Sequence, residues 1–446
     1  MAGGGVPVDV TGWLLARARP CAFVVTAVGG TGARVAVERE LRERGWRQAA
    51  APGEADLLVV CGPEDAELAD AVERVWEQMP GPRARVRVAG GDGAAPLLDS
   101  ARGHLLDVDR QRRQAAERDA RARERAQRSD GDGHGNAGHG RDESPGDGGA
   151  QGGGDGKSEG GGDDHGDADG GHGQGDGHGN GGGDGAGQDD GHGHGSGDGD
   201  SDDGHGHGHD HGGMSMPGGI PMADRGPDRD GLRLDRLHVH LGPALADWPA
   251  GLRLRLTLQG DVVQEAEAEI VGGTAVASAF WDVPGPAADL DSAQRFLAVA
   301  GWSAAAEAGR RWRDALLAEP GPGEPTRRGV LRWLRRVRRS RVLRWSTDGL
   351  GRIGGSAPDP LRGDVTDRWA RLLDGVEAAV GAPGVSDAAG RDRPASDSRA
   401  QAAEAALDLL PSLVTGRELA AVRLTVASLD PDAEALRAHV PGRSHG

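Results

Sequence analysis

A long segment of glycine and charged residues divides this chain into two parts. Residues 129–219 are mostly Gly, Asp and His, with scattered Ser and Asn and almost no large apolar side chains. Such a segment cannot bury enough apolar surface to offset the entropy lost on ordering. We therefore expect a disordered linker. The linker dilutes the apolar fraction to 36% and contributes much of the net charge of -18.

The part before the linker alternates between strand and helix patterns. Apolar runs predict strands at residues 21–28, 55–61 and 83–88. Helical spacing of apolar residues predicts helices at 34–44 and 66–79. This alternation favours an α/β domain with a small doubly wound parallel sheet.

A glycine-rich loop follows the first predicted strand, at Gly29-Gly30-Thr31-Gly32. Glycines at the start of a helix let backbone amides approach a phosphate. Only part of the dinucleotide fingerprint is present, because Val35 stands at the third glycine position and Glu54 is only a loose match to the expected acid. The loop is therefore more typical of a tight turn than of a phosphate site.

A distinctive motif stands at the end of the second predicted helix. The motif consists of Val75, Gln78, Met79, Pro80, Pro82 and Arg83. With the apolar strand before it, this segment resembles the 20 kDa-type (B) subunit of proton-pumping NADH-quinone oxidoreductase and the related hydrogenase small subunits. The resemblance implies a fold that holds one four-iron four-sulfur cluster on four thiolates.

The cysteines needed for that cluster are missing. The chain contains two cysteines, Cys21 and Cys61, and the family's third cysteine would fall near Gly91. Cys61 stands where the family has a small residue at a strand end, so we interpret both cysteines as buried thiols in a reducing cytoplasm. The sequence argues against a bound cluster.

A second resemblance begins at Leu237. Gly242, Pro243 and Gly251 fit the start of the 49 kDa-type (D) subunit of the same enzyme, which is akin to hydrogenase large subunits. There, a histidine-bearing loop leads into a hairpin, which we expect here at Leu252–Leu258 and Val262–Ile270 around the turn Gln259-Gly260-Asp261. The family's histidine positions hold Leu245 and Pro249, and the chain has no tyrosine for a quinone site.

Helices are expected after this hairpin, at residues 289–317, 327–345, 364–380 and 398–410, followed by a closing strand at 421–427. The predicted C-terminal domain is therefore α+β, a hairpin beside a helical bundle. The helix at 327–345 carries nine arginines around an apolar stripe. We expect these arginines to be solvated or paired within the chain, with docking to a membrane or protein as the alternative and nucleic acid as the least favoured partner.

The linker itself carries candidate metal ligands. Imidazoles alternate with glycine at His192, His194, His205, His207, His209 and His211, and thioethers follow at Met214 and Met216. This composition suits nickel, zinc or copper, and the alternative is a spacer without a metal role. His238 and His240 share one face of a predicted strand, where they form a surface pair or extend a metal site.

The N-terminus lacks the basic flank of a secretory signal, and no apolar run reaches the roughly 20 residues that a membrane span needs. We expect a cytoplasmic protein, with peripheral contact at the inner membrane face left open.

The predicted organisation is a 20 kDa subunit-like domain at 1–106, a charged helix and linker at 107–225, and a 49 kDa subunit-like domain at 226–446. Our first hypothesis is a non-catalytic scaffold or assembly partner of respiratory or hydrogenase-type subunits. The second is a metal-handling protein, and the third is a redox subunit with a quinone or iron-sulfur role. No catalytic or cofactor-binding residue is assigned.

Overall fold

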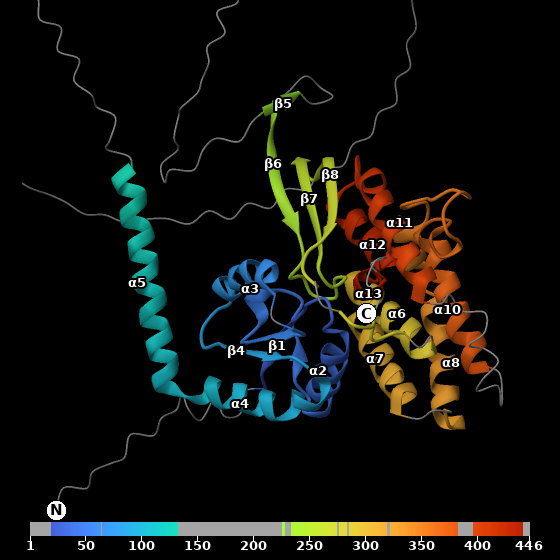
Figure 1. The fold of residues 1–446 in the computed structure, drawn as a ribbon, viewed down its shortest axis with the longest axis horizontal. Coiled ribbons are helices and arrows are strands. Elements are labelled where there is room, and N and C mark those ends of the chain that lie inside the picture. The colour runs from blue at the N-terminus through green and yellow to red at the C-terminus, as the bar shows by residue number, and fades with distance from the viewer. Residues whose placement is uncertain are drawn as a thin grey trace, which may run out of the picture.

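The computed structural model describes residues 19–63, 65–132, 225–227, 233–273, 276–282, 285–318, 322–381 and 396–439. An N-terminal α/β domain lies beside a C-terminal region made of an antiparallel sheet and a group of helices (Figure 1). Almost all of the predicted linker lies outside the described residues. No helix in the described part of the chain combines the length and the apolar character needed to cross a bilayer.

The N-terminal sheet has four parallel strands in the order β2-β1-β3-β4. They are β1 (Cys21–Thr26), β2 (Arg47–Gln48), β3 (Leu57–Cys61) and β4 (Ala84–Val88). Strand β3 is central, and all five of its residues are buried. A continuous apolar run is what a parallel strand covered on both faces requires.

Helices cover both faces of this sheet. One face packs against α2 (Thr31–Glu43) and α4 (Ala94–Leu106), and the other packs against α3 (Ala66–Gln78). Helix α4 was not predicted, although its buried residues Ala94, Leu98, Ala101 and Leu105 recur at helical spacing. Short 3-10 turns at Pro52–Glu54 (η1) and Gly91–Gly93 (η2) complete the domain.

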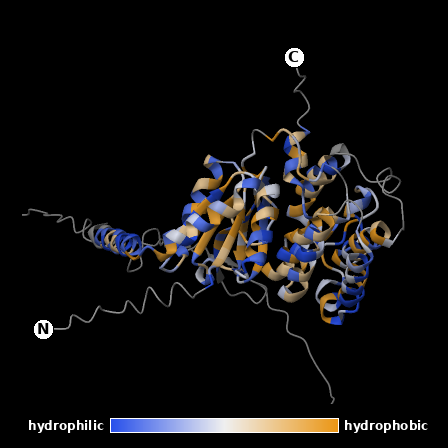
Figure 2. Ribbon diagram, turned by 90° about the horizontal axis from the view of Figure 1, so that it is seen from below, coloured by the Kyte–Doolittle hydropathy of each residue, from blue (hydrophilic) through white to orange (hydrophobic). Residues whose placement is uncertain are grey.

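The charged helix expected after this domain is present as α5 (Val108–Asp132). It projects from the end of α4 as a long, mostly hydrophilic rod (Figures 1 and 2). Gln111 fixes its base, because its side-chain amide donates to the carbonyl oxygens of Arg83 at 3.1 Å and His104 at 2.8 Å.

The predicted hairpin is present and belongs to a larger antiparallel sheet in the order β5-β6-β7-β8. Its strands are β5 (Arg225–Pro227), β6 (Arg233–Leu241), β7 (Leu252–Gln259) and β8 (Val262–Ile270). Leu252, Leu254, Leu256 and Leu258 of β7 are buried and share a core with helices from the end of the chain. Alternation of apolar and polar residues along β7 therefore gives the sheet one buried face.

Eight helices follow in the described part of the C-terminal region. They are α6 (Pro286–Val299), α7 (Ser303–Ala318), α8 (Glu324–Arg338), α9 (Arg341–Thr347), α10 (Val365–Gly381), α11 (Ser396–Val414), α12 (Leu419–Leu429) and α13 (Ala433–Ala438), with a 3-10 turn, η3, at Asp359–Leu361.

Three expectations for this region were wrong. The helix predicted at 289–317 is two helices, because Gly301 adopts a φ of 80° between α6 and α7. The helix predicted at 327–345 is also divided, where the Ser340 hydroxyl accepts a hydrogen bond from the backbone N–H of Leu343 and caps α9.

The strand predicted at 421–427 is the third error, because these residues lie in helix α12. Its β-branched residues favoured a strand. Its buried residues Val422, Thr425, Val426 and Leu429 instead follow the spacing of one helix face, which packs on the sheet.

Candidate functional site

The strand order of the N-terminal sheet reverses between β1 and β3, and this point is where open α/β sheets bind ligands. The glycine-rich loop after β1 lies there. A Cβ added to Gly30 would lie 2.2 Å from the carbonyl oxygen of Cys61, and the N–H of Ala27 donates to the same oxygen at 2.8 Å. Close packing of the loop against β3 therefore accounts for a glycine at position 30 without any bound phosphate.

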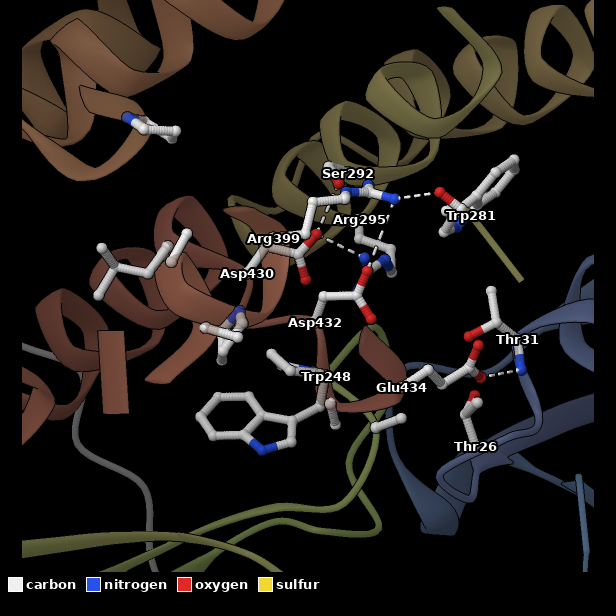
Figure 3. Close-up of a pocket in the computed structure, with 18 of the residues that line it drawn as sticks. Thr26, Thr31, Trp248, Trp281, Ser292, Arg295, Arg399, Asp430, Asp432 and Glu434 are labelled. Carbon is white, nitrogen blue, oxygen red and sulfur yellow. Dashed lines mark hydrogen bonds and ion pairs between the residues drawn. The ribbon is translucent and has the colours of Figure 1, made fainter. Parts of the chain in front are cut away.

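A cavity of about 210 Å³ lies beside this loop, between the N-terminal domain and the C-terminal region. Figure 3 shows its labelled lining residues: Thr26, Thr31, Trp248, Trp281, Ser292, Arg295, Arg399, Asp430, Asp432 and Glu434. The end of β1 and the start of α2 form one wall. Helices α6 and α11 and the connection from α12 to α13 form the other walls.

Glu434 bridges the two parts of the chain at this cavity. Its Oε1 accepts a hydrogen bond from the backbone N–H of Thr31 at 2.9 Å, and its Oε2 accepts one from the N–H of Phe280 at 2.9 Å. Thr31 is the first residue of α2, and a helix N-terminus favours negative charge. The Glu434 carboxylate therefore stands where the anionic group of a ligand would bind.

The other charged residues of the cavity are paired across its walls. Arg295 donates to Asp430 at 2.5 Å, and Ser292 donates to the same carboxylate at 2.6 Å. Arg399 donates to the carbonyl oxygen of Trp281 and lies 3.7 Å from Asp432. These pairs balance positive and negative charge around the cavity.

Asp432 also caps α13 by accepting the N–H of Ala435 at 3.0 Å. Burial raises the pKa of the Asp432 carboxyl, and this effect outweighs the opposing effects of the cap and of Arg399. The Asp432 carboxyl therefore takes up a proton at a higher pH than an ordinary aspartate does.

A buried ion network lies behind the cavity and joins α2 to α6 and α7. Arg34 contacts Asp291 at 2.6 Å, and Arg313 contacts both Glu38 at 2.6 Å and Asp291 at 2.7 Å. The side chains of Arg313, Glu38 and Asp291 are 0%, 1% and 1% exposed. Four charges from two separate parts of the chain are thus buried together.

The arginines of this network lower the pKa of both carboxyl groups. Burial alone would raise the pKa of Glu38, but the positive charges of Arg34, Arg313 and Arg310 outweigh burial and lower the pKa to about 2. Burial would also raise the pKa of Asp291, but the positive charges of Arg34, Arg295 and Arg313 outweigh it. The pKa of Asp291 therefore lies well below its ordinary range. Both carboxylates therefore stay charged at neutral pH.

A further contact joins the two parts near the start of α3. The N–H of Gly272 donates to Glu67 at 2.8 Å, and the N–H of Gly273 donates to Asp65 at 3.0 Å. Asp65 is also the N-cap of α3. Carboxylates at the start of α3 therefore hold the loop that follows β8.

The two cysteines lie on opposite faces of the N-terminal sheet. Cys21 begins β1 and packs with α3, whereas Cys61 ends β3 and packs with α2 and α4. Burial raises the pKa of both thiols, and the effect is greater at Cys61. Because they face opposite sides and opposite ends of the sheet, the two thiols cannot ligate one cluster together.

The predicted metal ligands of the linker, from His192 to Met216, lie outside the described residues. His238 and His240 are exposed on β6, and the imidazole of His238 lies 3.2 Å from the Thr257 hydroxyl. Within the described ranges, no three His, Cys, Asp or Glu side chains come close enough to hold a metal ion.

The loop between β6 and β7 contributes Trp248 and Pro249 to the cavity wall. Pro249 is the position where the resemblance expects a histidine, so this part of the wall is apolar. The charged residues of the site were missed because the contacts that join the two parts of the chain are distant in sequence. The contact of Arg34 with Asp291 spans 257 residues, that of Arg313 with Glu38 spans 275, and that of Glu434 with Thr31 spans 403.

The fold and the site define a two-part protein, an α/β domain joined by buried charges to a mixed sheet and helix region. No protein-family model matches this chain, and no curated protein shows significant similarity to it.

Proposed function

We propose that this chain is a non-catalytic scaffold or assembly partner related to respiratory oxidoreductase and hydrogenase subunits. The observation that carries the proposal is the contact between Glu434 and the start of α2. At the point where comparable α/β sheets bind a ligand, the chain supplies its own carboxylate. A catalytic subunit would keep this position open for a substrate or cofactor.

The buried ion network gives the two parts one relative arrangement. Breaking a buried pair leaves an uncompensated charge and costs about 3–5 kcal/mol, so alternative packings of α2 against α6 and α7 are strongly disfavoured. A fixed arrangement of two modules is the physical requirement for a scaffold. The positions of Cys21 and Cys61 support the same proposal, because a shared cluster would need both thiols on one side of the sheet.

Helices α8 and α9 provide the surface where a partner would dock. We define the arginine face as Arg332, Arg335, Arg339, Arg341 and Arg344 together with Val342 and Trp345. Val342 and Trp345 are 76% and 85% exposed. An exposed tryptophan among arginines is typical of protein interfaces, where both residue types are enriched.

Only some arginines of this region are neutralised within the chain. Arg338 contacts Asp374 at 2.6 Å and also pairs with Glu377, while Arg336 lies over the ring of Trp302 at 5.6 Å. The five arginines of the arginine face form no ion pair with any residue that the structure describes. The docking partner is therefore expected to be a protein with an acidic surface and an apolar recess for Trp345.

Site-specific crosslinking tests this docking surface. A photoreactive residue replaces Trp345 in the full-length chain, and the matched control replaces Leu237, which is 48% exposed on β6. We expect a protein adduct at position 345 that is lost when Arg335 and Arg339 are both changed to Gln. Lipid adducts alone at position 345, or equal protein adducts at both positions, would contradict docking to a specific protein partner.

A further inference from the structure

A second cavity, of about 310 Å³, lies between α5 and the edge formed by α3 and β4. We call it the α5 groove. Six arginines line it: Arg83, Arg85, Arg110, Arg118, Arg121 and Arg125. The acidic residues of its lining are Glu73, Glu77 and Glu117. The groove therefore carries an excess of positive charge.

Ion pairs within the lining neutralise only part of the positive charge of the α5 groove. At its rim, Arg85 pairs with Glu73 at 2.8 Å and Arg125 pairs with Glu77 at 2.7 Å. Removing these two pairs from six arginines and three glutamates leaves four arginines and one glutamate, a net charge of +3. An anion with several charges would neutralise this interior.

The groove is a built feature of the fold. Arg83 is 6% exposed, donates to the carbonyl oxygen of Met79 at 3.0 Å, and lies over the ring of Trp76 at 4.1 Å. Its backbone N–H donates to Gln111 at 2.9 Å, which fixes the base of α5 against β4. Both walls are therefore held in place without a ligand.

Two buried polar atoms of the groove lack partners. The Nε of Arg110 and the Oε1 of Gln114 are inaccessible to solvent and have no hydrogen-bond partner among the described residues. Buried polar atoms are rarely left unpaired, because each one costs about 1–3 kcal/mol. The Gln114 amide can turn to present its NH₂ group, so both side chains can donate to an anion.

The charges within the groove also act on one another. Burial lowers the pKa of Arg83, and the neighbouring charges of Arg118 and Arg121 lower it further. These three cations therefore repel one another, and an anion bound among them would reduce this repulsion.

We propose that the α5 groove binds a diphosphate group, either as inorganic pyrophosphate or as part of a nucleoside diphosphate. Guanidinium groups bind phosphate oxygens through paired hydrogen bonds, and a diphosphate of charge about -3 matches the groove interior. The site is separate from the interdomain cavity and does not depend on the proposed scaffold function.

Calorimetry on the full-length chain tests the proposal, with pyrophosphate, ADP and a short poly-aspartate peptide as the probes. We expect pyrophosphate to bind, and Arg118→Gln and Arg121→Gln each to weaken binding about tenfold, since each removes one charge-assisted contact. Arg112→Gln is the matched control, because Arg112 lies on α5 outside the groove with a side chain that is 77% exposed. Tighter binding of ADP than of pyrophosphate would identify the nucleotide as the source of the diphosphate.

A second variant tests the same site by occupying it with a carboxylate of the chain itself. Gln114→Glu places a carboxylate in the groove, so we expect it to abolish pyrophosphate binding and to raise the melting temperature of the chain without ligand. The proposal is overturned if pyrophosphate and ADP both fail to bind the intact chain, if Arg112→Gln weakens binding as much as Arg118→Gln does, or if only poly-aspartate binds.

Discussion

Arg313 on α7 and Glu38 on α2 lie 2.6 Å apart, with side chains that are 0% and 1% exposed. The two residues are 275 positions apart in the chain and belong to its two separate parts. Their contact makes the interface between these parts depend on buried charge as well as on apolar packing. The position of the cavity follows from this interface, because Arg34 of the same network also lines the cavity.

Removing one member of this pair should destabilise the chain strongly. Glu38→Ala leaves Arg313 and Arg34 with reduced compensation in a buried site, so we expect a loss of about 3–5 kcal/mol in the free energy of unfolding. Arg338→Gln breaks only the exposed pairs with Asp374 and Glu377 and should cost about 1 kcal/mol or less. Denaturant unfolding measures both variants, and a similar small loss for each would contradict the role of the network.

The network should also set the pH dependence of stability. The pKa of Glu38 is about 2 in the folded chain, against about 4.3 in an unfolded one. Its stabilising contribution is therefore complete above about pH 4.3 and disappears as the pH falls through 2, with Asp291 acting in the same direction. Urea unfolding between pH 7 and pH 2 should show stability falling below about pH 5. Glu38→Gln should show a smaller fall over this range, and an unchanged fall would contradict the assignment.

Much of the N-terminal fold could be predicted from local sequence patterns. The strand that ends at Cys61 is a continuous apolar run, and Leu68, Val72 and Val75 of α3 recur at helical spacing. The prediction was wrong where tertiary packing determines the secondary structure. In α12, for example, the β-branched residues suggested a strand, but the segment is a helix. Local patterns also missed the breaks at Gly301 and Ser340, although a glycine after a helix and a serine before one are both typical helix-boundary signals.

The candidate site could not be predicted in the same way. Glu434 contacts Thr31 across 403 residues of chain, and no local pattern marks either residue as part of a shared site. The glycines at positions 29, 30 and 32 did indicate a loop with an unusual backbone arrangement. Its favoured interpretation as a tight loop agrees with the close approach of Gly30 to Cys61.

Glu434 should be replaceable by an external anion. Glu434→Ala removes the carboxylate from the start of α2 and should cost about 1–2 kcal/mol in the free energy of unfolding. Phosphate should then raise the melting temperature of the variant more than that of the wild-type chain, because the Thr31 N–H becomes available. Equal responses to phosphate in the two chains would show that this amide is not an anion site.

The histidine tract should bind metal independently of both folded parts. Calorimetry with nickel, zinc and copper should give several sites of similar, modest affinity, since repeated Gly-His units offer near-equivalent ligand sets. Affinity should fall below about pH 6.5, where protons compete for the imidazole nitrogens. Deleting residues 191–213 should remove most binding and leave thermal unfolding unchanged, whereas retained binding would make His238 and His240 the next candidates.

Iron and labile-sulfide analysis of the full-length chain, purified without oxygen, tests the scaffold proposal most directly. Two thiols on opposite faces of one sheet cannot supply the ligands of a four-iron cluster, so we expect no stoichiometric iron or sulfide and no iron-sulfur absorption. The variant with Cys21→Ser and Cys61→Ala should keep the fold. Stoichiometric iron and sulfide that are lost in Cys21→Ser would contradict the proposal and indicate a redox subunit.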